Sequence, residues 1–384
     1  MSFAVGVMAA NLYYAQPILS MLAASLGMRP DAAGLVMTLT QIGYGLGVLF
    51  IVPLGDLVEN KKLILTMIVM TIFAELAMGY AQSLVPFFIA SILAGIGASA
   101  VQIIVPYTTH LFEKNQRGAI IGSLMSGLML GIMLSRPMAS LMTDMVSLHS
   151  IFYLSAAIMT LLLWRLAVVL PQRQPEGTTL KYSQLIWSMK HLIMNTPTLR
   201  RRGMYQACMF GAFCLFWTIV PLTLVNNFGF SQKGVALFAL AGLAGAAVAP
   251  YAGKMADRGF GRRATVLAFV SAIISFVAGH FIESNTTLSI IALMLTANLL
   301  DAGVSAHLVL GQRAVFMIDP KNQSRLNGLY LAIIYVGGAI GSALGVWAFM
   351  YGGWGFATMI GMIFPVAALI LILTEAKFGY QEAY

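Results

Sequence analysis

The chain has 384 residues, of which 59% are hydrophobic and only 9% are charged, and its mean hydropathy is +0.86. Soluble proteins carry about 25% charged residues, so this composition excludes a soluble protein and indicates an integral membrane protein with apolar surface facing lipid. The net charge of +9 comes without the clustered basic patch that nucleic-acid binding needs, so we expect no nucleic acid partner.

Apolar stretches of spanning length recur along the whole chain, because a transmembrane helix uses about 20 apolar residues. We predict an all-α integral membrane protein with twelve transmembrane helices, at residues 1–27, 34–54, 63–81, 86–111, 119–143, 149–170, 204–226, 234–252, 264–282, 288–312, 327–350 and 354–374. The first stretch has no basic leader, so it is predicted to be a span rather than a signal peptide. It also has no hydrophilic residues before it, which is expected of a chain that lacks its natural start.

One connection is long and hydrophilic, and it divides the spans six and six. It covers residues 171–203, begins at Pro171 and ends with three arginines. The stretches before and after it carry equal numbers of spans, which indicates an internal duplication. We therefore predict an N-terminal six-helix bundle (1–170), a cytoplasmic linker (171–203) and a pseudo-symmetric C-terminal six-helix bundle (204–384).

The basic residues are distributed very unequally between the two sides of the predicted membrane. Eighteen of the 22 Lys and Arg residues fall on one side, two (Arg29 and Lys233) fall on the other, and Arg136 and Arg165 lie inside or at the edge of spans. Cytoplasmic loops of membrane proteins carry the excess of Lys and Arg. The distribution predicts that both termini are cytoplasmic.

A short loop pattern occurs twice, after the second and after the eighth predicted span. Each copy has a glycine, an acid four residues later and a pair of bases: Gly55, Asp56, Glu59, Lys61 and Lys62 in the first copy, and Gly253, Asp257, Arg258, Arg262 and Arg263 in the second. The glycine lets two helix ends turn tightly, and the acid can pair with a base or a helix N-terminus. Such contacts can form and break with a conformational change, so we predict that both loops act in gating.

This repeated loop resembles that of the major facilitator superfamily, and the resemblance covers essentially the full chain. The first copy has Glu59 where aspartate is usual, and it lacks two residues before its bases. The resemblance implies the fold of that superfamily, in which two six-helix bundles enclose a cavity lined by spans 1, 4, 7 and 10. The polar and aromatic residues on those spans are Asn11, Tyr14, Gln16, Gln102, Tyr107, Trp217, Asn298 and Asp301.

Two further segments are similar to segments of a bacterial efflux branch of this superfamily. Residues 11–17 match a Tyr-Tyr-x-Gln-Pro segment, and Gly127 and Gly131, followed by Arg136 and Pro137, loosely resemble a glycine-rich antiporter motif. The proline that usually follows the second glycine is absent. The resemblance implies proton antiport in the bacterial inner (plasma) membrane.

Charged residues inside the predicted spans are costly, at about 2.5–3.5 kcal/mol each on insertion scales. Asp301 lies near the middle of span 10 and shares a helical face with Asn298 and Ser305. Removal from water favours the neutral form of an acid, so Asp301 is a candidate proton carrier; the alternative is a structural acid paired with a base. Arg136 stays charged and could bind an anionic substrate group, act in gating, or pair with Asp301 or Glu75.

These features predict a secondary active transporter that moves a small solute by alternating access, and the efflux resemblance favours proton-coupled efflux. Proton-coupled uptake of a sugar, an organic acid or an amino acid is the alternative, and a channel or membrane sensor is an alternative of another class. We expect a monomer in the lipid bilayer that takes a small-molecule substrate and protons. We expect no enzyme activity, metal or cofactor, because the sequence has no catalytic cluster, His-rich set or ATP-binding loop.

Overall fold

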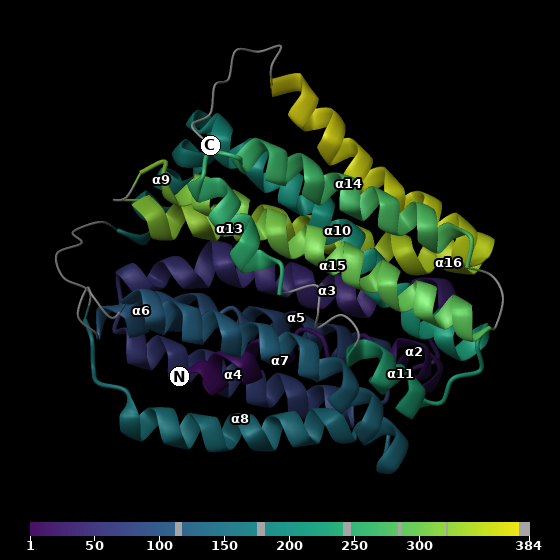
Figure 1. The fold of residues 1–384 in the computed structure, drawn as a ribbon. Helices are drawn as coiled ribbons and strands as arrows, with labels where there is room; N and C mark the ends of the chain where they lie inside the picture. The colour runs from purple at the N-terminus through teal and green to yellow at the C-terminus, as the bar shows by residue number, and fades with distance from the viewer. Residues whose placement is uncertain (112–116, 175–180, 241–246, 283–285, 320–321, 376–384) are drawn as a thin grey trace.

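The computed structural model describes residues 1–111, 117–174, 181–240, 247–282, 286–319 and 322–375, and throughout these ranges the prediction of an all-α fold is confirmed (Figure 1). The first half contains α1 (Ser2–Ala10), α2 (Leu19–Ser25), η1 (Pro30–Ala32), α3 (Leu35–Leu46), η2 (Gly47–Ile51), η3 (Val52–Asp56), α4 (Asn60–Tyr80), α5 (Leu84–Ala98), α6 (Val101–His110), α7 (Arg117–Met145) and α8 (Ser150–Val169). The second half contains α9 (Tyr182–Asn195), α10 (Pro197–Asn226), α11 (Gln232–Ala239), α13 (Ala249–Asp257), α14 (Gly261–His280), α15 (Thr287–Phe316) and α16 (Gln323–Glu375).

Nine helical stretches within the described residues are long and apolar enough to cross a membrane. One of them, Arg325–Thr374, covers predicted spans 11 and 12, because α16 turns back at Gly352 and Gly353 with non-helical backbone angles. Two predicted spans are not among the nine. The first is divided into α1 and α2, and the one at 234–252 includes residues 241–246, which lie outside the described residues. The count of twelve is therefore confirmed only in part.

The break in the first span lies between Ala10 and Leu19. The amide groups of Leu12 and Tyr13 donate to carbonyls three residues earlier, as in a tighter helix. Pro17 has no amide hydrogen and disfavours a helical conformation at the residue before it, so the regular helix cannot continue there. As a result, neighbouring side chains between Ala10 and Leu19 contact different partners in the protein interior.

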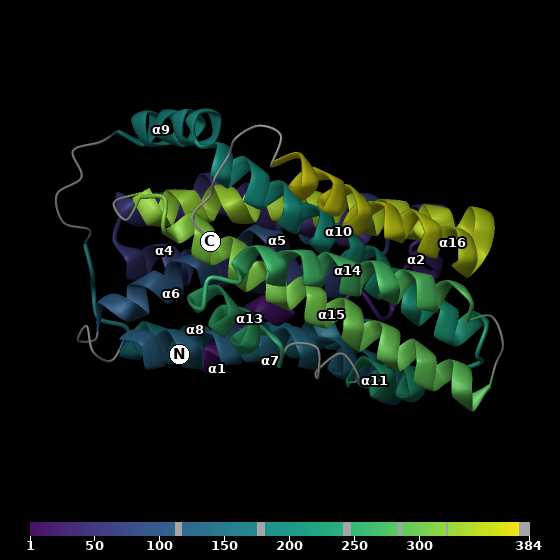
Figure 2. The same cartoon turned by 45° about the horizontal axis from the view of Figure 1, so that its top comes forward.

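The helices form two pseudo-symmetric bundles whose long axes run in roughly the same direction (Figures 1 and 2). Helices α1 to α8 make up one bundle, and α10, α11 and α13 to α16 make up the other. Helix α11 crosses over and packs on α7, and α9 lies beside the main body at one end (Figure 2). Both bundles contact α9: Tyr182 Oη donates to the carbonyl of Phe50 at 2.8 Å, and Arg325 Nη1 donates to Ser188 Oγ at 3.0 Å.

A close helix crossing joins α1 and α7 in the first bundle. A Cβ atom added at Gly127 would overlap the carbonyl oxygen of Ser2, and one added at Gly131 would overlap that of Gly6. Both overlaps are with backbone, which cannot move aside as a flexible side chain can. Small residues are what allow two helix backbones to approach this closely inside a membrane.

The second bundle repeats this crossing between α10 and α16. A Cβ atom at Gly337 would overlap the carbonyl oxygen of Ala207, and one at Gly341 would overlap that of Gly211. The glycines of the later helix and their partners on the earlier helix are four residues apart in both bundles. The pseudo-symmetry therefore extends to individual backbone contacts.

We expect Gly131→Ala to destabilise the protein by about 1–3 kcal/mol, because the added methyl group forces the α1 and α7 backbones apart. Gly45→Ala is the matched control, since the nearest atom to its added Cβ would be Tyr335 Cβ at 3.9 Å. Thermal unfolding of the purified variants in detergent measures the difference. Equal stability of the two variants would contradict this account of the crossing.

Candidate functional site

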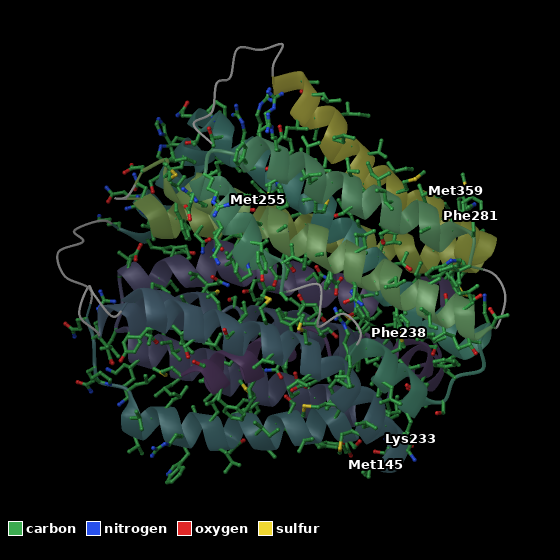
Figure 3. The ribbon with its side chains drawn as sticks, viewed as in Figure 1. Met145, Lys233, Phe238, Met255, Phe281 and Met359 are labelled. Carbon is green, nitrogen blue, oxygen red and sulfur yellow. The ribbon has the colours of Figure 1, made fainter. Side chains whose placement is uncertain are left out.

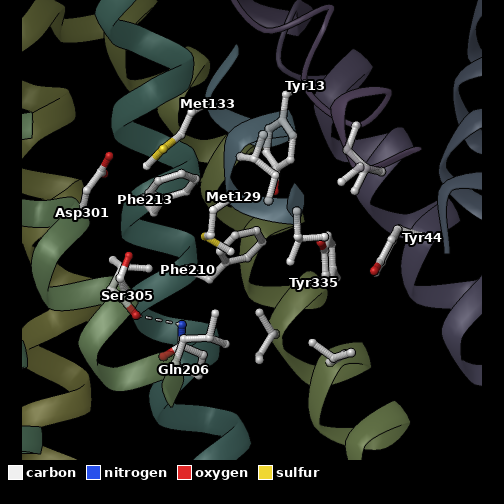
Figure 4. Close-up of a pocket in the computed structure, with 18 of the residues that line it drawn as sticks. Tyr13, Tyr44, Met129, Met133, Gln206, Phe210, Phe213, Asp301, Ser305 and Tyr335 are labelled. Carbon is white, nitrogen blue, oxygen red and sulfur yellow. Dashed lines mark hydrogen bonds between the residues drawn. The ribbon is translucent and has the colours of Figure 1, made fainter. Parts of the chain in front are cut away.

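A cavity of about 130 Å³ lies between the two bundles (Figure 4). Most of its wall is apolar, and the aromatic and methionine side chains in it are Tyr13, Tyr44, Met129, Met133, Phe210, Phe213 and Tyr335. Its polar groups are few: Gln102, Arg136, Gln206, Asp301 and Ser305. Residues from both bundles are therefore needed to build it.

Arg136 of α7 is the basic group of the cavity and is only 3% exposed. Its Nε donates to Gln16 Oε1 at 2.8 Å, and Gln16 Nε2 in turn donates to Thr218 Oγ1 at 3.4 Å. Three aromatic rings surround the guanidinium carbon, with centroids at 4.2 Å (Trp217), 5.2 Å (Phe213) and 5.5 Å (Tyr13). Cation–π contacts of this kind stabilise a desolvated arginine. Its Nη2 is buried and has no hydrogen-bond partner among the described residues.

Asp301 of α15 is the acidic group of the cavity and is 4% exposed. Trp217 Nε1 donates to its Oδ1 at 2.9 Å. Asp301 and Arg136 form no ion pair, although they line the same cavity. Trp217 contacts both, with its ring face under Arg136 and its N–H on Asp301.

Two further polar residues of the cavity, Gln102 and Gln206, are held by hydrogen bonds in the part of the cavity nearer the basic loops. Gln102 Nε2 donates to Tyr44 Oη at 2.8 Å, and Tyr44 stacks on Tyr335 with centroids 4.1 Å apart. Gln206 Nε2 donates to the carbonyl of Val304 at 3.3 Å, the contact drawn as a dashed line in Figure 4. Its Oε1 lies 2.6 Å from His307 Nδ1.

Four residues predicted for the cavity wall lie elsewhere. Asn11 Oδ1 accepts from Ser155 Oγ of α8 at 2.6 Å, and neither Asn11 nor Tyr14 lines the cavity. Tyr107 Oη donates to the carbonyl of Pro171 at 2.6 Å, where the linker begins. Asn298 Nδ2 donates to the carbonyl of Met294, one turn earlier in its own helix, at 2.9 Å.

Three of the predicted residues (Gln102, Arg136 and Asp301) line the cavity. Two others contact the charged side chains: Gln16 accepts a hydrogen bond from Arg136, and Trp217 donates one to Asp301. Prediction from sequence did not select Tyr13, Tyr44, Phe213 or Tyr335. Tyr13 is adjacent to the predicted Tyr14, and only the break after Ala10 decides which of the two tyrosines faces the cavity. No group of His, Cys, Asp and Glu residues in the described chain is arranged to hold a metal ion.

The first loop motif is held by contacts with the linker. Asn60 Nδ2 donates to the carbonyl of Gly55 at 2.5 Å, and Arg173 Nη1 donates to Asn60 Oδ1 at 3.2 Å. Lys62 pairs with Glu59 at 3.6 Å. The neighbouring residues Asp56 and Lys61 are both partly buried, and the charges of Arg173 and Arg325 act on Asp56.

The second loop motif is held to the end of α15. Asp257 forms an ion pair with Arg313, whose Nη1 also lies 3.4 Å from the carbonyl of Gly253. The three bases of this loop, Arg258, Arg262 and Arg263, are exposed. We call the end of the molecule that carries the two loop motifs and α9 the basic end.

At the opposite end the bundles are in direct contact. Lys233, the second residue of α11, pairs with Asp144 of α7 at 3.3 Å, and Figure 3 shows Lys233 beside Met145. Farther toward the cavity, Thr38 Oγ1 donates to the carbonyl of Ala339 at 3.1 Å. All of these contacts join one bundle to the other.

The cavity lies between this closed end and the basic end. On α15 its wall runs from Asp301 through Ser305 to Leu308, toward Arg313 at the basic end. On α7 it runs from Arg136 back toward the start of that helix. The two charges therefore mark the innermost part of the cavity, and the rest of the wall extends toward the basic end.

The chain is similar to known transporters along its whole length. The family model described as Major Facilitator Superfamily matches residues 1–306 and 203–379. The "Uncharacterized transporter YgaY" of Escherichia coli O157:H7 is 33% identical over 387 residues, covering 100% of this chain and 96% of that protein. The "Probable transporter SCO4007" of Streptomyces coelicolor is 28% identical, covering 91% of this chain and 80% of that protein.

Solved structures share the fold at low sequence identity. A POT family transporter in complex with 5-aminolevulinic acid superposes with a TM-score of 0.78 at 14% identity, over 98% of this chain and 96% of that one. A bacterial homologue of the human lysosomal transporter Spinster superposes with a TM-score of 0.73 at 13% identity, over 100% of this chain and 96% of that one.

Proposed function

This chain belongs to the Major Facilitator Superfamily and is a multi-pass membrane transporter, and from this premise we propose that it exports a small solute in exchange for protons. The observation that carries the proposal is a charged cavity that residues of both bundles build, with an ion pair between Asp144 and Lys233 that joins the bundles at the end opposite the basic end. A site of this kind serves alternating access, because rocking the bundles would close the basic end and open the other.

The bodies that we propose to move are the segments 1–170 and 204–384, joined by the linker 171–203. The excess of Lys and Arg supports a cytoplasmic basic end, with both termini on that side. On this assignment the cavity faces the cytoplasm, and the contacts around Asp144 and Lys233 form the external gate. The proposed location is the bacterial inner (plasma) membrane, as expected from relatives in Escherichia coli and Streptomyces coelicolor.

Asp301 is the proton-coupling residue in this proposal. It is the carboxyl group that faces the cavity, and its hydrogen bond from Trp217 holds it in place. A proton that binds Asp301 removes one negative charge from an apolar cavity that also holds Arg136, so protonation changes what the cavity can bind. The loop motifs act at the other gate, where their ion pairs form and break as the basic end opens and closes.

Proton-coupled uptake uses the same geometry with the direction reversed, so a measurement must separate the two. We expect that a solute added to proteoliposomes containing the purified protein moves protons in the opposite direction, and that the flux saturates. Proton movement in the same direction as the solute would support uptake instead. Flux that ignores a pH gradient and never saturates would overturn the proposal in favour of a channel.

A further inference from the structure

The cavity holds two opposite charges that act on each other but form no direct ion pair. Arg136 Nη2 is buried without a hydrogen-bond partner, and Asp301 accepts one hydrogen bond from the described residues, from Trp217. A buried charge without a partner is costly, by several kcal/mol in typical proteins. A ligand that supplies a partner to each group would remove this cost.

Trp217 and Gln16 keep the two charges apart. Trp217 has Arg136 over its ring face at 4.2 Å and Asp301 at its ring N–H at 2.9 Å. Gln16 holds Arg136 Nε from the other side at 2.8 Å. Opposite charges attract strongly in an apolar cavity, so without these contacts Arg136 and Asp301 would close on each other. Because the two groups form no ion pair and both line the cavity, each can contact a ligand there.

We propose that the substrate is a zwitterion, with a carboxylate that binds Arg136, an ammonium group that binds Asp301 and an apolar or aromatic body. The inference rests on the proposed transport function and names its substrate class. A simple anion would satisfy Arg136 but meet repulsion from Asp301, and a simple cation would do the reverse. The body would lie against the aromatic and methionine side chains that extend from the charges, among them Phe210, Phe213 and Tyr335 (Figure 4).

A zwitterionic substrate would also explain the exchange with protons, and no residue other than Asp301 is needed for it. A protonated Asp301 has no negative charge to offer an ammonium group, so a proton and the substrate exclude each other at that carboxylate. Arg136 is the charged group that faces Asp301 among the described residues, and Trp217 is its hydrogen-bond donor. Mutual exclusion at one group is what an antiporter requires.

The test compares three probes with the same phenyl body: L-phenylalanine, L-phenylalaninamide, which lacks the carboxylate, and 3-phenylpropanoate, which lacks the amine. Titration calorimetry on the purified full chain in detergent gives the three affinities. We expect L-phenylalanine to bind at least about tenfold more tightly than either analogue, because each charge-assisted contact contributes about that much. Failure of L-phenylalanine to bind more tightly than both would overturn the inference.

Two variants test which residue binds the carboxylate of the probe and which binds its ammonium group. In Arg136→Gln, L-phenylalanine should bind no better than its amide, while the preference over 3-phenylpropanoate remains. In Asp301→Asn, the pattern should be the reverse. The matched controls are Arg165→Gln, an exposed arginine, and Glu75→Gln, a buried acid outside the cavity, and both should keep both preferences.

The comparison of probes in the wild-type protein remains decisive if a variant fails to fold. It is also independent of transport, because no membrane gradient is present. Selective binding of the zwitterion together with proton-independent flux would contradict the proposed coupling alone. Proton exchange driven by a neutral solute, without any preference for L-phenylalanine over its analogues, would contradict the zwitterion alone.

Discussion

An Asp301→Asn variant is expected to lose solute-driven proton movement by a factor on the order of 100 or more, as when a proton-transferring group is removed from an active site. Asparagine is close to aspartate in shape, and its carbonyl can still accept from the Trp217 N–H, so the fold should be retained. It carries no titrating proton. Proteoliposomes with an internal pH indicator measure the effect, and any remaining solute exchange should be independent of pH.

Glu75→Gln is the matched control for this experiment. Glu75 is a buried acid of α4, 1% exposed, and neither of its carboxylate oxygens has a hydrogen-bond partner in the described chain. It does not line the cavity, so removing its proton site should leave most of the proton movement. Equal loss in the two variants, or full activity of Asp301→Asn, would remove the role we assign to Asp301.

Linking Asp144 to Lys233 should stop transport almost completely, because it would hold the bundles together at the end opposite the basic end. Asp144→Cys and Lys233→Cys, in a background without Cys208 and Cys214, can be joined by a short thiol cross-linker that a reductant cleaves. Transport should fall at least about tenfold on linking and return on cleavage, since alternating access requires this end to open.

The control for the linked protein is a pair at the same end but within one bundle. Arg29 and Asp31 form an ion pair at 3.2 Å in the loop between α2 and α3, so cysteines there can be linked without joining the bundles. Linking this pair should leave transport intact. Transport by the protein linked at Asp144 and Lys233, at an undiminished rate, would show that this contact is not a gate.

Much of the fold could be predicted from sequence, because lipid imposes a length and an apolar composition on every spanning helix. The long apolar stretches from Asn60 to Tyr80 and from Ser150 to Val169 are helices with nearly the predicted bounds. The break after Ala10 was not predicted, since apolar composition does not distinguish a straight helix from two short ones. Pro17 was the available signal.

The two charges of the site could be predicted for the same reason, since a charge at membrane depth needs a function or a partner. The arrangement of Arg136 and Asp301 around Trp217 could not be predicted. Asn298 was predicted for the cavity wall, but it does not line the cavity, and its side chain bonds to Met294 of its own helix, an option that every helical asparagine has. The role of Trp217 as the support of both charges depends on the packing of three helices, which no local pattern specifies.

The accessibility of a cavity cysteine from each side of the membrane tests the central claim most directly. In Ser305→Cys, introduced into the double-cysteine protein with Asp144 and Lys233 linked, a membrane-impermeant thiol reagent should react only from the basic end. After the link is cleaved and substrate is added, position 305 itself, distinguished from the freed thiols at positions 144 and 233 by peptide mapping, should also react from the opposite end, as the cavity turns outward. Reaction from both ends while the link is intact would contradict alternating access between two bundles.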